Sequence, residues 1–322
     1  MPAVMETSRV KLGLRLVKTH FRAGRQPASL IKAWAASDTS SEISTQWPSP
    51  RLLPPRLAAY VDLLHLAPIA FVLLAAIGFL VAAKHVWPPM STLAPFLVSV
   101  LLTQLAVSLH NDYCDRQLDS AAKPWRALPS GLLSPSSVLG AALAFTALGL
   151  LSALSMGWTV TVLVAAGTAA GFLYNAWLKR TLWTWVPFWV ALPTLALCAF
   201  TAMGRTTPRL WLAYVIGAPL VLGVYLADTL TDIESDASLG VHGLAQRLGT
   251  QVARAMCWGG VALALCLAGA LSADADFRYA FAAPGALLAL AMWSEWSGRR
   301  RLHWALIMAS AIALSVVWLF TL

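Results

Sequence analysis

Residues 93–119 read LAPFLVSVLLTQLAVSLHNDYCDRQLD, an apolar run that ends in a cluster of acids. Its first 17 residues carry no charge, and such a run forms most of a membrane-crossing helix. Three carboxylates follow, at Asp112, Asp115 and Asp119. An ionised Asp at the margin of an apolar helix is costly unless it is paired, hydrated or bound to a ligand. The stretch therefore predicts a membrane helix with a charged partner at its end.

The whole chain has the composition of an integral membrane protein. Of its 322 residues, 59% are hydrophobic and only 11% are charged. Uncharged or nearly uncharged segments long enough to cross a bilayer recur along it, with short connections that leave no room for a second globular domain. These segments are residues 61–83, 92–110, 136–156, 158–175, 183–203, 210–228, 253–272, 279–296 and 302–321. We expect an all-α, multi-pass membrane protein with nine transmembrane helices.

Positive charge is distributed unevenly between the two sides that this topology creates. If the N-terminus is cytoplasmic, 19 of the 23 Lys and Arg residues lie on the cytoplasmic side. Lys and Arg accumulate on that side of membrane proteins, so the pattern predicts a cytoplasmic N-terminus. The net charge of +9 is thereby explained by topology and attraction to an anionic bilayer. No nucleic-acid partner is required.

The first 56 residues form a separate, basic segment ahead of the predicted membrane domain, residues 57–322. Basic residues recur on one helical stripe of residues 8–24, which is typical of a cytosolic helix on a membrane surface. An organellar transit peptide is the alternative interpretation. Residues 36–55 are rich in Ser, Thr and Pro and are predicted to be a linker. We expect a bacterial plasma membrane location, or an organellar membrane if the segment is a transit peptide.

The acids at the end of the second predicted span share one helix face. Asp112, Asp115 and Asp119 stand at positions i, i+3 and i+7, which a helix places on one side. A solvated helix end would explain this cluster by itself. Three carboxylates on one face, however, could also bind a single ligand together.

A second acidic cluster ends the sixth predicted span. Residues 225–240, YLADTLTDIESDASLG, carry Asp228, Asp232 and Asp236 at i, i+4 and i+8, again on one face. Both clusters lie on the predicted cytoplasmic side, four spans apart, which indicates a weak internal repeat. A solvated helix end has no reason to recur in this way.

Two facing acidic helix ends repel each other unless cations lie between them. Carboxylates suit Mg²⁺, which usually takes one or two of them and completes its shell with water and substrate phosphates. The six acids are therefore predicted to form a Mg²⁺–diphosphate clamp. The four that we expect to be catalytic are Asp112, Asp115, Asp232 and Asp236.

A diphosphate also needs direct cations, and three basic residues lie near the acids in the sequence. Lys123 and Arg126 belong to KPWRALPSG, residues 123–131, and Lys179 ends the fourth span. Arg binds phosphate oxygens as a fork and Lys as a point charge. The positive-inside bias is the alternative explanation for basic residues here, and we retain it for Arg180.

Four motifs in this order resemble one known family. They are N-D-x-x-D-x-x-x-D at residues 111–119, KPWRALPSG at 123–131, YNAWLK at 174–179 and DIESDASLG at 232–240. Together they resemble the UbiA superfamily of intramembrane prenyltransferases, over roughly residues 57–322. The pair of aspartate motifs makes the resemblance specific.

The resemblance implies a nine-helix, all-α bundle around a central cavity. In this family Mg²⁺ holds the diphosphate of a polyprenyl donor, and an acceptor, usually aromatic, captures the allylic cation. The family's metal-binding positions correspond to Asn111, Asp112, Asp115, Asp119, Asp232 and Asp236, and Asp228 falls where many members have Asn or Asp. Its diphosphate contacts correspond to Lys123, Arg126 and Lys179, and a pocket residue to Tyr174. We group Asn111 with the substrate-binding residues.

The start of the first span departs from the family pattern. Members commonly have Arg-Pro there, whereas this chain has Asp62 and His65. A His at such a place is more often a satisfied polar core residue than a catalyst. The departure leaves the acceptor open among hydroxybenzoate-like, quinone-precursor, chlorophyllide-like, other tetrapyrrole and polyol phosphate molecules.

Three other functions compete with prenyl transfer to an acceptor. A terpene cyclase of the same fold would trap the cation with the substrate's own double bond. A transporter or channel would explain acidic helix ends, although transport sites usually lie near the bilayer midplane. A non-catalytic scaffold is the third, and intact acidic motifs argue against it.

Overall fold

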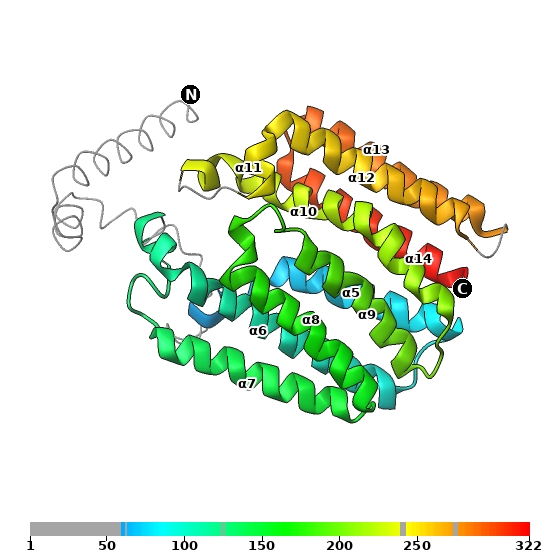
Figure 1. Ribbon diagram of the computed structural model, residues 1–322, viewed down its shortest axis with the longest axis horizontal. Coiled ribbons are helices and arrows are strands. Elements are labelled where there is room, and N and C mark those ends of the chain that lie inside the picture. The colour runs from blue at the N-terminus through cyan, green and yellow to red at the C-terminus, as the bar shows by residue number, and fades with distance from the viewer. Residues whose placement is uncertain (1–58, 62, 123, 125, 239–242, 273–275) are drawn as a thin grey trace. The chain divides into compact units, whose positions relative to one another are not determined.

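Every regular element among the described residues is a helix, as Figure 1 shows for this computed structural model. The structure describes residues 59–61, 63–122, 124, 126–238, 243–272 and 276–322. The long helices are α5 (Leu66–Lys84), α6 (Met90–Ala122), α7 (Pro135–Leu154), α8 (Trp158–Ala176), α9 (Val186–Ala202), α10 (Leu212–Ser238), α12 (Thr250–Ala270), α13 (Ala282–Trp296) and α14 (Arg300–Phe320). Short helices are η1 (Leu178–Arg180), η2 (Pro208–Trp211), α11 (Leu244–Leu248) and η3 (Asp276–Phe281). The predicted all-α fold class is confirmed for this part of the chain.

Each of the nine predicted segments corresponds to one long helix. Seven stretches are long and apolar enough to cross a membrane, namely α5, α6, α7, α8, α10 with η2, α12 and α14. The other two helices are shorter, because α9 has 17 residues and α13 has 15. The count of nine spans stays a prediction, and so does the cytoplasmic position of the N-terminus.

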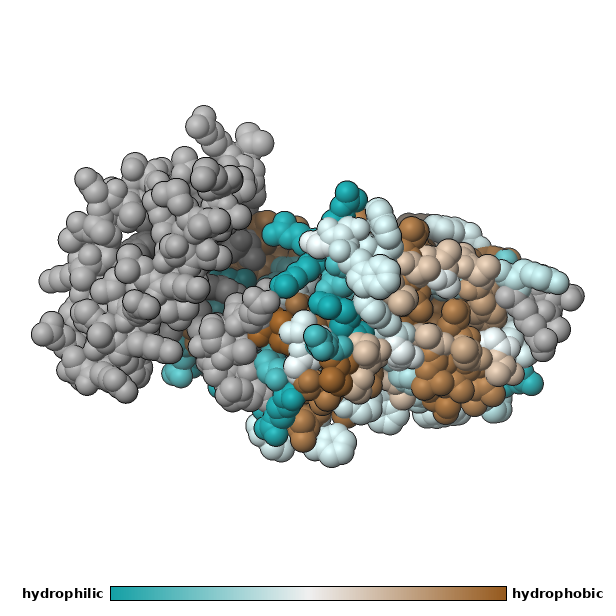
Figure 2. Space-filling view, turned by 90° about the horizontal axis from the view of Figure 1, so that it is seen from above, coloured by the Kyte–Doolittle hydropathy of each residue, from teal (hydrophilic) through white to brown (hydrophobic). Residues whose placement is uncertain are grey.

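The outer surfaces of these helices are apolar. Large leucines that would be buried in a soluble protein are more than half exposed, among them Leu74, Leu143, Leu151, Leu173 and Leu263. Figure 2 shows one face, where apolar side chains cover much of the described surface and hydrophilic ones gather in a band. Lipid replaces water around such a surface. The chain is an integral membrane protein.

Four helices form a closed ring at the centre of the bundle. Helix α5 contacts α9 and α14, and α10 also contacts α9 and α14. Helices α6, α7 and α8 pack together beside this ring, while α12 and α13 pack against α10 and α14 (Figure 1). The packing repeats along the chain, because α6 packs on α7 as α10 packs on α12.

Glycines allow α10 and α12 to approach closely. A Cβ on Gly223 of α10 would lie 2.7 Å from the Cys257 carbonyl oxygen, and one on Gly260 of α12 would lie 2.5 Å from the Pro219 carbonyl oxygen. Small residues of this kind let membrane helices pack backbone to backbone. The contact holds in place the helix that carries the second acidic motif.

The two helices that bear the acidic motifs are longer than the bilayer core is thick. Helix α6 has 33 residues and α10 has 27, which correspond to about 50 Å and about 40 Å of helix. The hydrocarbon core is only about 30 Å thick. Each helix is therefore longer than the core, and the acids lie in its C-terminal part.

Candidate active site

Three carboxylates lie close together on the last turns of α6. Asp112, Asp115 and Asp119 expose only 2%, 9% and 7% of their surface. We call these three residues the acid cluster. Their helical spacing places them on one face, as predicted. Because they are buried, the alternative of a solvated helix end is wrong for this cluster.

Arg126 bridges two members of the acid cluster. One guanidinium nitrogen, Nη1, donates to Asp112 Oδ1 at 2.6 Å and to Asp119 Oδ2 at 3.1 Å. The segment after α6 turns back to allow this, with Gly131 at a φ of 76° that suits glycine. The turn is closed by a hydrogen bond from the Leu133 amide to the Ala127 carbonyl at 3.1 Å.

Lys179 reaches the acid cluster from the other side. It lies in η1, directly after α8, and its Nζ donates to Asp115 Oδ2 and, at 3.3 Å, to Asn111 Oδ1. Asn175 anchors the end of α8 to α6 by donating to the Val107 carbonyl at 2.8 Å. Two of the predicted diphosphate contacts, Arg126 and Lys179, are thus brought against the predicted metal ligands.

His65 lies at the edge of the acid cluster. Its Nε2 is 3.4 Å from Asp112 Oδ2, and 39% of its side-chain surface is exposed. The interpretation as a satisfied core histidine is therefore wrong. The residue precedes α5 with a φ of 42°, a conformation that costs non-glycine residues energy and often occurs at functional sites.

The second acidic motif lies on the last turns of α10. Asp228 Oδ1 accepts a hydrogen bond at 3.0 Å from the indole Nε1 of Trp304, which lies on α14. Asp232 and Asp236 follow on the same helix, one and two turns later. Their side chains lie outside the description, as do Lys123 and Asp62 entirely.

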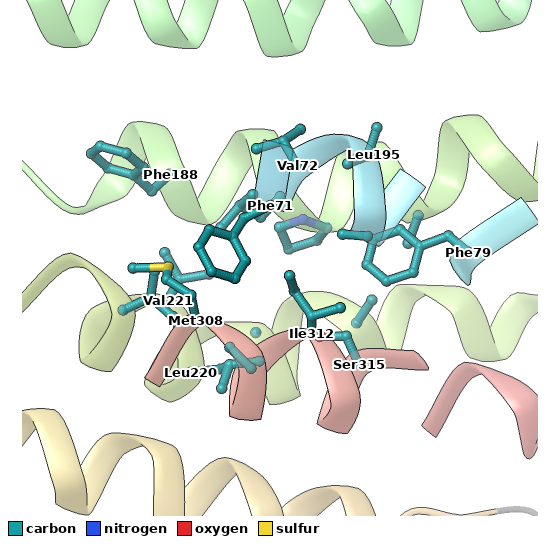
Figure 3. A pocket seen from close by; sticks show the side chains of 18 of the residues that line it. Phe71, Val72, Phe79, Phe188, Leu195, Leu220, Val221, Met308, Ile312 and Ser315 are labelled. Carbon is teal, nitrogen blue, oxygen red and sulfur yellow. The ribbon is translucent and has the colours of Figure 1, made fainter. Parts of the chain in front are cut away.

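An apolar cavity of about 220 Å³ lies inside the four-helix ring. Its walls come from α5, α9, α10 and α14, and Figure 3 shows Phe71 of α5 across it from Met308 and Ile312, which lie side by side on α14. Among the described residues that line it, Asp228 is the one charged side chain. We call the end of the cavity at Asp228 its mouth.

A row of aromatic rings connects the cavity with the end of α8. Tyr174 packs edge to face on Phe188 at 4.8 Å between ring centroids, and Phe188 lies 6.1 Å from Tyr225. A Cβ on Gly243 would lie 3.3 Å from the Lys179 carbonyl oxygen and 3.4 Å from Tyr225 Oη. Lys179 and the cavity wall are therefore neighbours.

Tyr174 itself is not among the lining residues of this part of the chain, although Phe188 and Tyr225 are. The predicted pocket residue thus supports the wall from behind. Sequence reasoning missed Trp304 at the mouth. Nothing distinguishes it in the sequence from the other members of a set of 15 tryptophans.

The described side chains alone do not make up a metal centre. No group of three or more His, Cys, Asp or Glu among them is arranged to hold an ion. Arg126 and Lys179 instead hold carboxylate oxygens of the acid cluster. One buried atom, Asp112 Oδ2, makes no hydrogen bond to the described residues, although His65 Nε2 lies 3.4 Å from it.

Comparison with known proteins identifies relatives over much of the chain. Residues 71–317 match the family model described as the UbiA prenyltransferase family. The chain is 29% identical over 156 residues to digeranylgeranylglyceryl phosphate synthase of Korarchaeum cryptofilum, covering 47% of this chain and 54% of that protein. It is 28% identical over 188 residues to chlorophyll synthase of Arabidopsis thaliana, covering 53% and 48%. The chain thus spans about half the length of these two curated relatives.

A 4-hydroxybenzoate octaprenyltransferase of Hydrogenovibrio crunogenus matches over a longer stretch. It is 30% identical over 210 residues, which cover 61% of this chain and 71% of that protein. Among solved structures, a UbiA homologue from Archaeoglobus fulgidus bound to GPP and Mg²⁺ superposes with a TM-score of 0.63. The match covers 80% of this chain and 99% of that one at 15% identity, so it shows a shared fold.

Proposed function

Since the chain belongs to the UbiA prenyltransferase family, we propose that it transfers a polyprenyl group from a polyprenyl diphosphate to a small, aromatic acceptor. The match to the family model over residues 71–317 confirms the family predicted from the sequence. The observation that carries the proposal is the pairing of Arg126 and Lys179 with the acid cluster, beside an apolar cavity. The basic residues with the acid cluster suit a diphosphate, and the apolar cavity suits a prenyl chain.

The residues present fit Mg²⁺ as the cofactor. Buried carboxylate oxygens on one helix face are ligands that this ion prefers, and Asp112 Oδ2 has no hydrogen-bond partner among the described residues. The residues that would hold the ion are Asp112, Asp115, Asp119, Asp228, Asp232 and Asp236. When bound, Mg²⁺ supplies positive charge that stabilises the departing diphosphate.

The basic side chains bind the diphosphate directly in this proposal. Arg126 presents a planar fork to phosphate oxygens, and Lys179 presents a point charge. Their present contacts with Asp112 and Asp115 keep both cations at the site and keep the carboxylates neutralised. Asn111, already in contact with Lys179, adds a polar group on the same side.

The cavity receives the hydrocarbon tail. Its walls are almost entirely apolar, so a prenyl chain is stabilised there and water is excluded. The C1–O bond breaks, its electron pair leaves with the diphosphate, and C1 becomes an allylic cation. The acceptor's electron pair then forms the new bond to C1, and the acceptor loses a proton.

The names of the relatives suggest which acceptors to try. They name 4-hydroxybenzoate as an acceptor, and chlorophyll and digeranylgeranylglyceryl phosphate as products; 4-hydroxybenzoate and chlorophyll are aromatic. Near the start of the first span, where family members commonly have Arg-Pro, this chain has Asp62 and His65, and His65 lies 3.4 Å from Asp112, so its acceptor can differ from theirs. We therefore propose an aromatic acceptor and leave its identity to the experiment.

The test is diphosphate release by the purified, detergent-solubilised protein. Geranylgeranyl diphosphate is supplied with Mg²⁺ or with EDTA, and with 4-hydroxybenzoate, a chlorophyllide, a quinone precursor or a glyceryl phosphate lipid. We expect release that needs Mg²⁺ and one aromatic acceptor, with the prenylated product seen by mass spectrometry. Release without any acceptor would instead indicate a cyclase.

Asp115→Asn serves as the matched inactive variant. The substitution keeps the size of the side chain but removes the charge and replaces one acceptor oxygen with an NH2 donor, so turnover should fall at least about 100-fold. Thermal unfolding must show that the variant is folded. If the wild type releases no diphosphate from donors of several lengths, the result contradicts the proposed function and favours the transporter alternative.

A further inference from the structure

Trp304 stands where the apolar cavity meets the acidic end of the bundle. Its indole Nε1 donates to Asp228 Oδ1 at 3.0 Å, and its ring meets Phe71 edge to face at 5.3 Å between centroids. All three residues line the cavity, and they come from three helices, α14, α10 and α5. An aromatic pair thus covers the position at which the lining changes from apolar to charged.

The residue that precedes Trp304 belongs to a buried polar network. The preceding residue, His303, is 2% exposed and accepts a hydrogen bond from Trp258 Nε1 at 3.0 Å. Glu295 lies 3.9 Å from the same imidazole and pairs with Arg254 at 2.8 Å. These contacts join α12, α13 and the first turn of α14. The network therefore holds the first turn of α14 in place, and the contacts with Asp228 and Phe71 position the indole itself.

A prenyl diphosphate bound as proposed above has its reactive carbon at this place. Its diphosphate lies among the acids and cations, and its tail lies in the cavity, so C1 lies at the mouth beside Trp304 and Phe71. Aromatic faces attract cations, and Trp does so most strongly. A bulky indole at the same place also prevents water from reaching the cation.

We infer that Trp304 shields the allylic cation from water, so that the acceptor rather than water captures it. This inference rests on the proposed function and assigns one of its steps to a residue. If water captures the cation, its oxygen forms a bond to C1 and it loses a proton, and the products are prenyl alcohol and diphosphate. The ratio of prenyl alcohol to prenylated acceptor therefore reports on Trp304.

The experiment measures that ratio for wild type and for Trp304→Phe, Trp304→Leu and Trp304→Ala. The protein, geranylgeranyl diphosphate and the active acceptor are incubated in ¹⁸O-labelled water. Alcohol that comes from the cation carries ¹⁸O, whereas alcohol released by a contaminating phosphatase does not. Trp296→Leu is the matched control, because Trp296 on α13 is 86% exposed and lies outside the lining.

We expect Trp304→Leu and Trp304→Ala to raise the labelled ratio about tenfold, because a smaller side chain lets water reach the cation. Trp304→Phe retains a ring and should raise it about two- to threefold, and Trp296→Leu should leave it unchanged. An unchanged ratio in active variants, or equal losses of both products, would overturn the inference. If the Leu and Ala variants fail to fold, an unchanged ratio in Trp304→Phe would overturn it.

Failure of the inference and failure of the proposed function give different results. An active wild type whose Trp304 variants show an unchanged ratio refutes the inference alone. A wild type that releases no diphosphate from any donor refutes both.

Discussion

Lys179 donates a hydrogen bond to Asp115 from 64 positions further along the chain. The contact joins η1, which follows α8, to the last turns of α6. It brings a cation that the sequence places at the end of one span against an acid that ends another.

Lys179→Ala should lower kcat/KM for the prenyl diphosphate roughly 10- to 100-fold, the scale of one charged hydrogen bond. Lys179→Arg should retain part of the activity, because the charge remains. Arg180→Ala is the control, since Arg180 is adjacent but was assigned to membrane topology. Diphosphate release over a range of donor concentrations checks this. Equal effects of Lys179→Ala and Arg180→Ala would contradict a specific role for Lys179.

Arg126→Ala should destabilise the protein as well as inactivate it. Asp112 is 2% exposed. Removing the Arg126 side chain leaves the buried Asp112 carboxylate unpaired, which lowers the free energy of unfolding by about 3–5 kcal/mol where no other cation compensates. Thermal unfolding in detergent measures the effect. Arg116→Ala is the control, because Arg116 lies over the Tyr113 ring at 4.2 Å instead of on the acid cluster. If both variants have the melting temperature of wild type, the Arg126–Asp112 ion pair does not stabilise the fold.

Gly260→Ala should destabilise the α10–α12 contact, whereas Gly259→Ala should not. The added methyl group at Gly260 would lie 2.5 Å from the Pro219 carbonyl, and overpacking of this kind costs about 1–3 kcal/mol. A Cβ on Gly259 meets nothing within 4 Å, and Ala favours a helix by about 0.5–1 kcal/mol. The melting temperatures of the two variants should therefore move in opposite directions. A similar shift in melting temperature for both variants would show that the close approach of α10 and α12 at Gly260 does not limit stability.

Ala75→Phe should shorten the prenyl chain that the protein accepts. Ala75 lines the cavity between Phe71 and Phe79, which are about 12 Å apart along α5. The phenylalanine ring at position 75 fills the part of the cavity farther from the mouth. The enzyme's donor preference should therefore shift from geranylgeranyl diphosphate toward geranyl diphosphate. Competition between the two donors gives the ratio directly. Leu74→Phe is the control, because Leu74 is 57% exposed on the outer surface.

The helices were predictable, but their ends were not. The segment 92–110 corresponds to α6, which continues to Ala122, and 210–228 corresponds to α10, which continues to Ser238. An apolar run marks only the part of a helix that lipid surrounds, and the polar turns beyond it give no such signal. The acids therefore belong to the same helices as the apolar runs before them.

The candidate site was predictable in its residue types and only partly in its contacts. The one-face spacing of Asp112, Asp115 and Asp119 follows from helix geometry alone. The burial of these acids does not, because it depends on segments that return from elsewhere in the chain. His65 shows the same limit, since its position next to Asp112 depends on how α5 begins beside α6.

The sequence by itself determined that this protein lies in the membrane, which helices carry acids and on which face. These properties follow from local composition and helical periodicity, which act within a single segment. Only the tertiary structure decided that Arg126 holds Asp112 and Asp119, that Lys179 holds Asp115, and that Trp304 meets Asp228. Such contacts depend on how each helix is rotated and how closely it packs. At Gly171 of α8, for example, a Cβ would lie 2.8 Å from Val107 Cγ2 of α6, so this glycine lets α8, which leads into Lys179, approach the helix that carries Asp115.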